Sequence, residues 1–205
     1  KEDEVKKMIN LYYHGGSANH GCEAIVRSTA KILNVPMRLF TTSPEEDILY
    51  GLNEIVEVIE DKERSLDRKK LEFFYSAISH KITGTDYQYI RHSHKEFLKQ
   101  ISDTDICMSI GGDNYCYSGV DKLGYYNKMI HKKGAKTVLW GCSIEPCVLT
   151  KEVIKDLKRY DLITVRETLS YESLKKAGIV DNVILCSDPA FQLDKVEADL
   201  PIGFD

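Results

Sequence analysis

The chain of 205 residues contains 28 Lys or Arg and 32 Asp or Glu, which gives a formal net charge of −4. Hydrophobic residues make up 42% and charged residues 29%, so the chain is too apolar to be a disordered protein. Its apolar runs fall far short of the ~18 residues of a membrane-spanning helix, and its slight excess of acid argues against nucleic acid as a partner.

The first half of the chain alternates short apolar runs with segments of helical periodicity. Strands are predicted at Met8–Tyr13, Met37–Phe40 and Ile55–Ile59. Helices are predicted at Gly21–Leu33, around Glu45–Asp47, at Leu71–Ile82 and at Tyr87–Ile101. The mixed-charge run Asp61–Lys70 is interpreted as a solvated face or loop.

The alternation becomes regular from Asp105 onwards. Strands are predicted at Asp105–Ile110, Lys136–Trp140 (broken by Gly141), Leu162–Val165 and Val183–Cys186, and helices at Lys122–Lys133, Lys151–Tyr160 and Ser170–Ala177. Continuous apolar strands that alternate with helices are typical of parallel βαβ units covered on both faces. We therefore predict an α/β fold: a Rossmann-like, doubly wound, mostly parallel sheet with helices on both faces.

The six cysteines do not form a pattern that binds metal or builds a disulfide framework. There is no C-x-x-C, and the nearest pairs are Cys107/Cys116 and Cys142/Cys147. Buried reduced thiols are expected instead, and no metal site is predicted. Because the chain also lacks an N-x-[ST] sequon, we expect a cytoplasmic protein.

Small and polar residues follow the ends of the predicted strands. The five turns concerned are His14–Gly21, Gly111–Asn114, Gly141–Pro146, Arg166–Glu167 and Ser187–Pro189. Ligands of an open parallel sheet bind outside the carboxyl ends of its strands, where glycines allow close approach and helix N-termini attract anions. One such turn could be a simple corner, but five at one edge predict a binding site.

Three common nucleotide and hydrolase motifs are absent. The first turn does not space its glycines as G-x-G-x-x-G, and the second strand ends in Thr41-Thr42-Ser43 rather than in an acidic residue. Gly134–Thr137 precedes a strand instead of opening a helix as a P-loop does, and no G-x-S-x-G occurs. These observations weigh against NAD, P-loop and serine-hydrolase chemistry, and no cofactor is expected.

Five motifs in order resemble those of the polysaccharide pyruvyl transferase family, over about Ile9 to Leu193. They are Gly15-Gly16-x-x-Asn19-x-Gly21-x-Glu23-Ala24, Asp105–Gly112, Trp140-Gly141-x-Ser143-Ile144-x-Pro146, Asp161–Glu167 with Ser170, and Asp188-Pro189-Ala190-Phe191. The chain departs from the family pattern at Cys22, Asp113 and Glu145, where Asp, Gly and Gly are common in the family.

The resemblance implies an enzyme of glycosyltransferase-B-like (GT-B-like) build. Such an enzyme transfers the pyruvyl part of phosphoenolpyruvate, its donor substrate, to two hydroxyls of a surface-polysaccharide sugar, free or lipid-linked, and forms a ketal. A lipid-linked acceptor would place the protein at the inner face of the membrane. Relatives continue into a second Rossmann-like domain, so residues 1–195 are expected to form an N-terminal domain and residues 196–205 to begin a linker. The chain alone is expected to lack transferase activity, and no oligomeric state is predicted.

The chemistry of phosphoenolpyruvate selects the candidate residues. Its carboxylate and phosphate need cations and N–H donors, for which Arg166 is the strongest candidate because a guanidinium binds such groups with two parallel hydrogen bonds. The substrate-binding candidates are Gly15, Gly16, Asn19, Gly112, Asn114, Ser143, Arg166 and Asp188. Ketal formation also needs acid and base groups, for which the candidates are His14, His20, Glu23, Asp113 and Glu145. Tyr115 and Tyr117 could stack on a sugar or simply pack.

Two other functions stay open on the sequence alone. One is a GT-B-type glycosyltransferase that uses a nucleotide sugar. The other is a non-catalytic sugar-binding module on the same scaffold, which the departures at Cys22, Asp113 and Glu145 favour.

Overall fold

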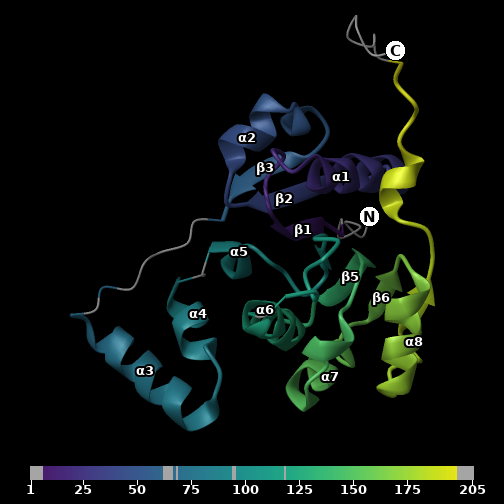
Figure 1. The fold of residues 1–205 in the computed structure, drawn as a ribbon. Helices are drawn as coiled ribbons and strands as arrows, with labels where there is room; N and C mark the ends of the chain where they lie inside the picture. Colours follow the sequence, from purple (N-terminus) through teal and green to yellow (C-terminus); the bar gives the residue numbers. More distant parts are fainter. Residues whose placement is uncertain (1–6, 62–66, 68, 94–95, 118, 198–205) are drawn as a thin grey trace, which may run out of the picture.

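The computed structural model of the chain describes residues 7–61, 67, 69–93, 96–117 and 119–197. Within these residues, seven parallel strands form one sheet in the order β3-β2-β1-β4-β5-β6-β7 (Figure 1). The strands are β1 (Ile9–His14), β2 (Met37–Thr41), β3 (Glu57–Glu60), β4 (Ile106–Ser109), β5 (Lys136–Cys142), β6 (Leu162–Val165) and β7 (Val183–Leu185).

Helices connect these strands in sequence. They are α1 (His20–Leu33), α2 (Pro44–Leu49), α3 (Leu71–Thr83), α4 (Tyr87–Ser93), α5 (Glu96–Lys99), α6 (Asp121–Lys132), α7 (Lys151–Leu157) and α8 (Thr168–Lys176), with 3-10 turns η1 (Leu52–Glu54), η2 (Pro146–Val148) and η3 (Pro189–Gln192). Among the described residues, none of the helices combines the length and hydrophobicity needed to cross a bilayer.

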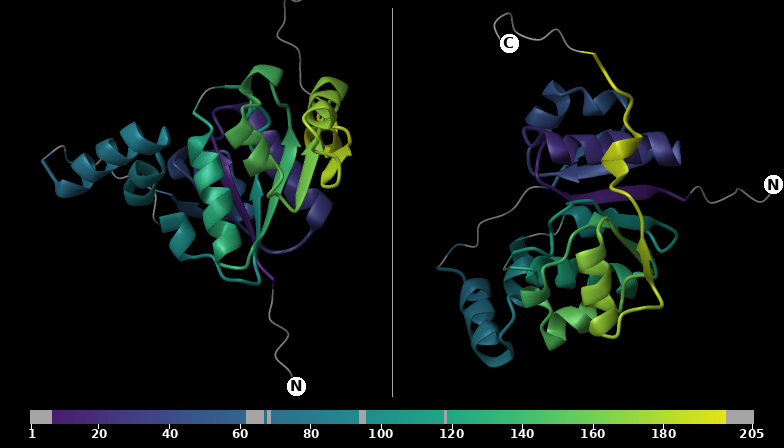
Figure 2. Two further views of the ribbon diagram at one scale, coloured as in Figure 1. Left: turned by 90° about the horizontal axis from the view of Figure 1, so that it is seen from below. Right: turned by 45° about the vertical axis from the view of Figure 1, so that its right-hand side comes forward.

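Two apolar layers hold the helices to the sheet, one on each face, which confirms the predicted doubly wound arrangement. On one face Ile25 and Val26 of α1 pack with Leu11 and Leu39 of the central strands. The other face is covered by α6, α7 and α8, and there Tyr126 belongs to a larger buried cluster (Figure 1). The chain after β7 then returns to the first face, where η3 lies against α1 (Figure 2).

The central strand β1 marks the point where the order of the strands reverses. Leu11 of β1 lies opposite Leu39 of β2 on one side and Met108 of β4 on the other. The chain thus builds the sheet outward from β1 through β2 and β3, and then starts again beside β1 with β4. In open α/β sheets a crevice lies at such a switch point, outside the carboxyl ends of the two strands.

Several predicted boundaries are wrong. The helix predicted over Tyr87–Ile101 ends at Lys99, and its described parts are α4 and α5, on either side of residues 94–95, which lie outside the described residues; α5 places Phe97 and Leu98 in the core. The strand predicted over Ile55–Ile59 begins two residues later, because the N–H groups of Ile55 and Val56 donate back to the carbonyl of Leu52 in η1. Most of the run 61–70, and residues 198–205 of the predicted linker, lie outside the described residues.

Strand β5 does not stop at Gly141 but continues through it to Cys142. Gly141 has φ +62, a left-handed conformation that glycine adopts without steric cost, and the pairing with β6 shifts register between Leu139 and Cys142. The glycine therefore bends the strand at the edge of the sheet rather than ending it.

All six cysteines are free thiols, but only two are buried. Burial raises the pKa of Cys107 to about 12 and that of Cys142 further still, so both thiols are inert at neutral pH. Cys147 and Cys186 are exposed, which corrects the expectation of burial. Cys186 is exposed because it follows β7, the strand at the edge of the sheet.

Candidate functional site

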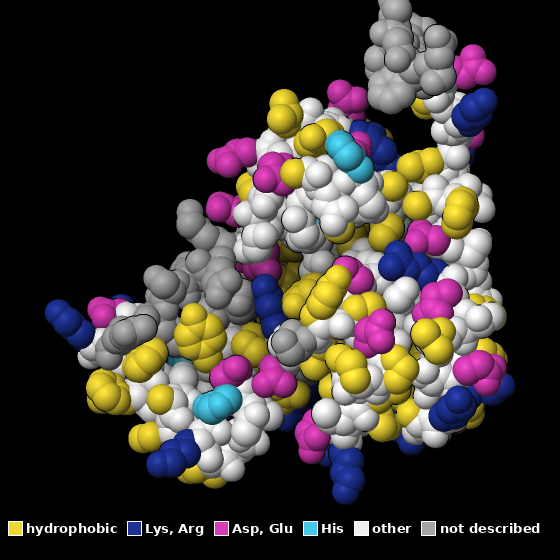
Figure 3. All heavy atoms as spheres, viewed as in Figure 1, with side chains coloured by type: hydrophobic (Ala, Val, Ile, Leu, Met, Phe, Trp, Pro, Cys, Tyr) yellow, Lys and Arg dark blue, Asp and Glu magenta, His cyan; other side chains and the backbone are white. Residues whose placement is uncertain are grey.

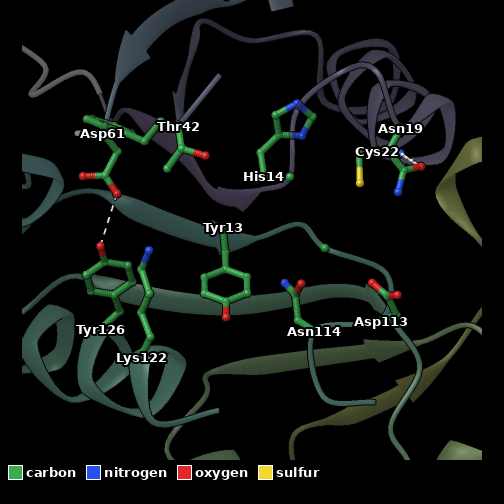
Figure 4. Close-up of a pocket in the computed structure, with 13 residues that line it drawn as sticks. Tyr13, His14, Asn19, Cys22, Thr42, Asp61, Asp113, Asn114, Lys122 and Tyr126 are labelled. Atoms are coloured by element: carbon green, nitrogen blue, oxygen red, sulfur yellow. Dashed lines mark hydrogen bonds between the residues drawn. The ribbon is translucent and has the colours of Figure 1, made fainter. Parts of the chain in front are cut away.

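The switch point carries a cavity of about 270 Å³, here called the switch-point cavity. Its lining comes from loops after four strands and from two helices, and consists of Tyr13, His14, Gly15, Asn19, Cys22, Phe40, Thr42, Asp61, Gly111, Asp113, Asn114, Lys122 and Tyr126 (Figure 4). Of the predicted site residues it therefore brings together His14, Gly15, Asn19, Asp113 and Asn114.

A bulge at the end of β1 shapes this cavity. Tyr13 has φ +64, which is uncommon for a residue other than glycine, and the pairing of β1 with β2 shifts register between Leu11 and His14. The bulge breaks the alternation of the strand, so the neighbouring residues Tyr12 and Tyr13 both contact the same buried cluster. Tyr13 thereby lines the cavity.

The loop after β4 forms another wall. The Nδ2 of Asn114 donates to the Oγ of Ser109, and a Cβ on Gly111 would lie 1.8 Å from the Oδ1 of Asn114. Only glycine leaves room for this arrangement at position 111. Asn114 is thus fixed with its amide group at the cavity.

Three residues that sequence reasoning did not select lie on one side of the cavity: Asp61, Lys122 and Tyr126 (Figure 4). The hydroxyl of Tyr126 donates to the Oδ2 of Asp61 at 3.2 Å. Asp61 is only 6% exposed, and its other oxygen, Oδ1, is buried with no hydrogen-bond partner in the structure. A buried acceptor of this kind calls for a donor such as a ligand hydroxyl. The Nζ of Lys122 lies 5.5 Å from the ring centre of Tyr13 and 5.6 Å from that of Tyr126.

A second cavity, of about 220 Å³, adjoins the first and shares Asn19, Cys22 and Asp113 with it. We call it the arginine cavity, and its lining consists of Asn19, Gly21, Cys22, Ile25, Gly112, Asp113, Arg166, Asp188 and Ala190. Gly112, Arg166 and Asp188, predicted as substrate-binding residues from three separate motifs, thus line one cavity.

The guanidinium of Arg166 is held in place by two hydrogen bonds. Its Nε donates to the Oγ of Ser143 at 2.8 Å, and its Nη1 donates to the Oδ2 of Asp188 at 2.9 Å. The group lies against the backbone of Gly112, where a Cβ would come within 2.5 Å of Nη1. A guanidinium has five N–H groups, so these bonds fix its plane without exhausting its donors.

The first helix begins between the two cavities. The Oδ1 of Asn19 caps α1 by accepting from the N–H groups of Gly21 and Cys22. Asn19 therefore serves to start the helix as well as to line both cavities. Burial raises the pKa of the Cys22 thiol, although a hydrogen bond from the backbone of Gly15 lowers it, so Cys22 is protonated at neutral pH.

His14 is anchored away from solvent. Its side chain is 1% exposed, and its Nε2 lies 2.9 Å from the Oδ1 of Asp47 in α2. The same oxygen accepts from the hydroxyl of Ser17 at 2.5 Å. Burial alone would raise the pKa of Asp47, but the hydrogen bonds from His14, Ser17 and Thr41 outweigh it and lower that pKa. Asp47, which sequence reasoning did not select, thus holds the turn after β1 to α2.

Asparagine at position 47 is expected to weaken the fold and to change its pH dependence. Because the pKa of Asp47 is lowered in the folded chain, its ionised form stabilises the fold above the unfolded pKa of ~3.9, and this contribution is lost as the pH falls through the folded value. Asp47→Asn should cost about 1–3 kcal/mol at pH 7 and show a shallower loss of stability below pH 4. Urea unfolding from pH 7 to pH 2 measures both effects. Asp194→Asn, whose side chain is 88% exposed, is the control and should follow the parent chain; parallel curves for Asp47→Asn would refute the assignment.

The other predicted candidates stand apart from the two cavities. His20 is 74% exposed at the start of α1, with its Nδ1 3.3 Å from the Oε2 of Glu23, and Glu23 also accepts from Arg27 at 2.7 Å. Glu145 is exposed at the start of η2. Gly16 has φ +91 and faces α2, where a Cβ would clash with Glu46. Ser143 contributes through its bond to Arg166.

Tyr115 and Tyr117, which could stack on a sugar or pack, lie in different surroundings. Tyr115 is fully buried, and its hydroxyl donates to Asp156 at 2.8 Å, so it packs and does not stack on a ligand. Tyr117 is 66% exposed. Among the described residues, His, Cys, Asp and Glu do not gather in any group of three or more that could hold a metal ion.

Comparisons with known proteins address the fold and the family. Two solved structures resemble the chain: the uncharacterised protein KP1_0663 of Klebsiella pneumoniae subsp. pneumoniae NTUH-K2044 (15% identity, TM-score 0.45) and Arabidopsis thaliana UGT89C1 complexed with UDP (10% identity, TM-score 0.47). The alignments cover 92% and 97% of this chain but 51% of each of the other two, so the chain spans about half their length. No curated protein matches the chain.

A family model gives the assignment. The model of the polysaccharide pyruvyl transferases matches residues 19–203, from the cap of α1 to beyond the segment that carries Asp188. The match includes Gly112 and Arg166 of the arginine cavity, and Ser143, which accepts a hydrogen bond from Arg166. The chain belongs to the polysaccharide pyruvyl transferase family.

Proposed function

We propose that the protein carrying this chain transfers the pyruvyl group of phosphoenolpyruvate to two hydroxyls of a sugar and forms a cyclic ketal. Family membership supports the reaction class. The observation that carries the proposal is the fixed guanidinium of Arg166, held by Ser143 and Asp188 against the backbone of Gly112. A planar, oriented guanidinium suits the carboxylate or phosphate of phosphoenolpyruvate.

The charges around the two cavities favour binding of the donor and of the acceptor in different cavities. Lys122 and Arg166 supply positive charge, whereas Asp61, Asp113 and Asp188 supply negative charge. We assign the donor to the arginine cavity, beside the N-terminus of α1, and the acceptor sugar to the switch-point cavity. There the unpartnered Oδ1 of Asp61 would accept from a sugar hydroxyl.

The reaction joins both hydroxyl oxygens to the central carbon of the pyruvyl group and releases phosphate. The two hydroxyls lose two protons in total. One balances the proton that converts the methylene of the donor into a methyl group, and the other leaves with the phosphate. Asp113 is exposed and lines both cavities, so among the five acid–base candidates it is the one we assign to the attacking hydroxyl. His14 acts through its bond to Asp47, which positions the turn after β1.

The donor carries more negative charge than these residues balance, because Asp188 already compensates Arg166. We therefore propose that a second Rossmann-like domain, joined through the chain beyond residue 195, supplies further cations and completes a GT-B-like cleft. In this arrangement the present chain binds the donor weakly and does not turn it over alone. We propose a cytoplasmic enzyme, working at the inner face of the membrane when its acceptor is lipid-linked.

A thermal-shift comparison distinguishes the proposed donor from a nucleotide sugar. Phosphoenolpyruvate at a hundredfold excess over its Kd should stabilise the enzyme by about 2.7 kcal/mol, which raises Tm by several degrees. UDP-sugars at the same concentration should leave Tm unchanged. The reverse pattern would indicate a glycosyltransferase. A Tm that rises with acceptor sugars but with neither phosphoenolpyruvate nor UDP-sugars would indicate a non-catalytic sugar-binding module.

The decisive assay measures phosphate release and ketal formation with phosphoenolpyruvate and a panel of acceptor glycans. It requires the full-length enzyme. Turnover by residues 1–205 alone would refute the proposed need for a second domain.

A further inference from the structure

Helix α3 turns its apolar residues toward solvent. Leu71, Phe74, Tyr75, Ile78 and Ile82 follow the spacing i, i+3, i+4, i+7, i+11, which places them on one face of a helix. Their exposures are 86%, 57%, 61%, 59% and 78%. These five residues are here called the α3 stripe.

The α3 stripe takes no part in the packing of the core. α3 packs against α4, and within α3 the buried residue is Ser76, on the side away from the stripe. A surface helix of a globular protein normally shows the opposite pattern, with apolar residues inside and polar residues outside. A contiguous exposed apolar face of this kind marks an interaction surface. Figure 2 shows α3 at the outer end of the molecule, where a flat surface can reach it.

Basic side chains border the α3 stripe. Lys70 and Lys81 are both exposed: Lys70 directly precedes Leu71 at the start of the helix, and at 100° per residue Lys81 falls along the edge of the stripe beside Phe74. The acidic residue of the helix, Glu72, lies beyond the other edge, with its Oε1 4.0 Å from His92 of α4. Hydrophobic side chains gather over α3 at the lower left of Figure 3, with Lys or Arg side chains beside them.

We propose that the α3 stripe lies in the surface of a lipid bilayer that contains anionic lipids. Aliphatic and aromatic residues on one face with lysines along its edge are the features of helices that lie in the membrane interface. The stripe would enter the boundary of headgroups and acyl chains, while Lys70 and Lys81 contact the negative headgroups. This proposal does not depend on the reaction proposed above.

Vesicle co-sedimentation tests the proposal. The parent chain should bind phosphatidylcholine vesicles that contain phosphatidylglycerol, bind pure phosphatidylcholine vesicles far more weakly, and dissociate as salt is added. Phe74→Ser with Ile78→Ser should weaken binding about tenfold or more, and Lys70→Gln with Lys81→Gln should do the same for the anionic vesicles. The matched control is Ile48→Ser with Leu49→Ser, in α2, where the parent residues are 52% and 81% exposed; it should bind as the parent does.

Three results would overturn the proposal. Failure of the parent chain to bind anionic vesicles rejects the membrane assignment by itself. Equal binding of anionic vesicles by the parent chain, the serine variant and the lysine variant rejects it too. A parent dimer that Phe74→Ser with Ile78→Ser converts to a monomer would assign the stripe to a second copy of the chain. Circular dichroism verifies that each variant is folded. If the serine variant unfolds, the lysine variant tests the proposal, because it removes no apolar contact.

Discussion

Replacing Arg166 by alanine is expected to lower kcat/KM for phosphoenolpyruvate by about a hundredfold or more in the full-length enzyme. The reason is geometric as well as electrostatic. Ser143 and Asp188 hold the guanidinium in one plane against Gly112, so its remaining N–H groups are already oriented for the proposed donor. Arg166→Lys keeps the charge but loses the planar fork, and should recover only a small part of the activity.

The matched control is Arg159→Ala. Arg159 also pairs with an aspartate, Asp156, at 2.7 Å, and its side chain is 26% exposed against 28% for Arg166, but it lines neither the switch-point cavity nor the arginine cavity. Its loss should leave the kinetics intact. Initial rates at varied phosphoenolpyruvate separate kcat from KM. If kcat and KM for phosphoenolpyruvate are unchanged in Arg166→Ala, Arg166 is not part of the donor site.

The largest loss of stability is expected for Gly141→Ala, at about 2–4 kcal/mol. Two costs add at this position. Alanine at φ +62 is strained, and its Cβ would lie 2.6 Å from the Cδ and 2.9 Å from the Cγ of Pro189. The proline is held by the segment that covers α1, so the clash cannot be relieved by a simple change of rotamer.

Gly178→Ala separates these two costs. Gly178 has φ +73, but a Cβ there would come no closer than 3.8 Å to its nearest neighbour, the Nζ of Lys158. That variant should therefore lose only the ~1–2 kcal/mol of backbone strain. Urea denaturation of both variants gives the difference, which measures the contact with Pro189. Equal losses in the two variants would mean that Pro189 moves aside without cost.

The fold could be predicted because its signals are local. The apolar runs and the glycine turns at Gly111 and Gly178 are read along the chain, and parallel βαβ units leave few ways to arrange them. The same rule predicts that Gly112, Ser143 and Arg166 lie at one edge of the sheet, and the structure shows them in contact there.

The rest of the site depends on contacts between distant segments. Asp61 belongs by sequence to a charged run, and Lys122 begins a predicted helix that contains other lysines, so neither residue differed from its neighbours. They line one cavity because the loop after β3 and the helix α6 both border the space outside the carboxyl ends of the strands. His14 was selected for its chemistry, but its pairing with Asp47 is decided by how α2 packs against the turn after β1.

The return of the chain to α1 has a consequence for the order in which the protein is made. α1 is synthesised well before η3, which covers it, and before Asp188, which orients Arg166. During translation α1 therefore stays partly uncovered, and Arg166 lacks its aspartate partner, until the segment after β7 has emerged. Contacts so distant in sequence are slow to form, and a nascent domain of this kind is open to misassembly in the interval. The segment that covers α1 is thus also the segment that positions Arg166.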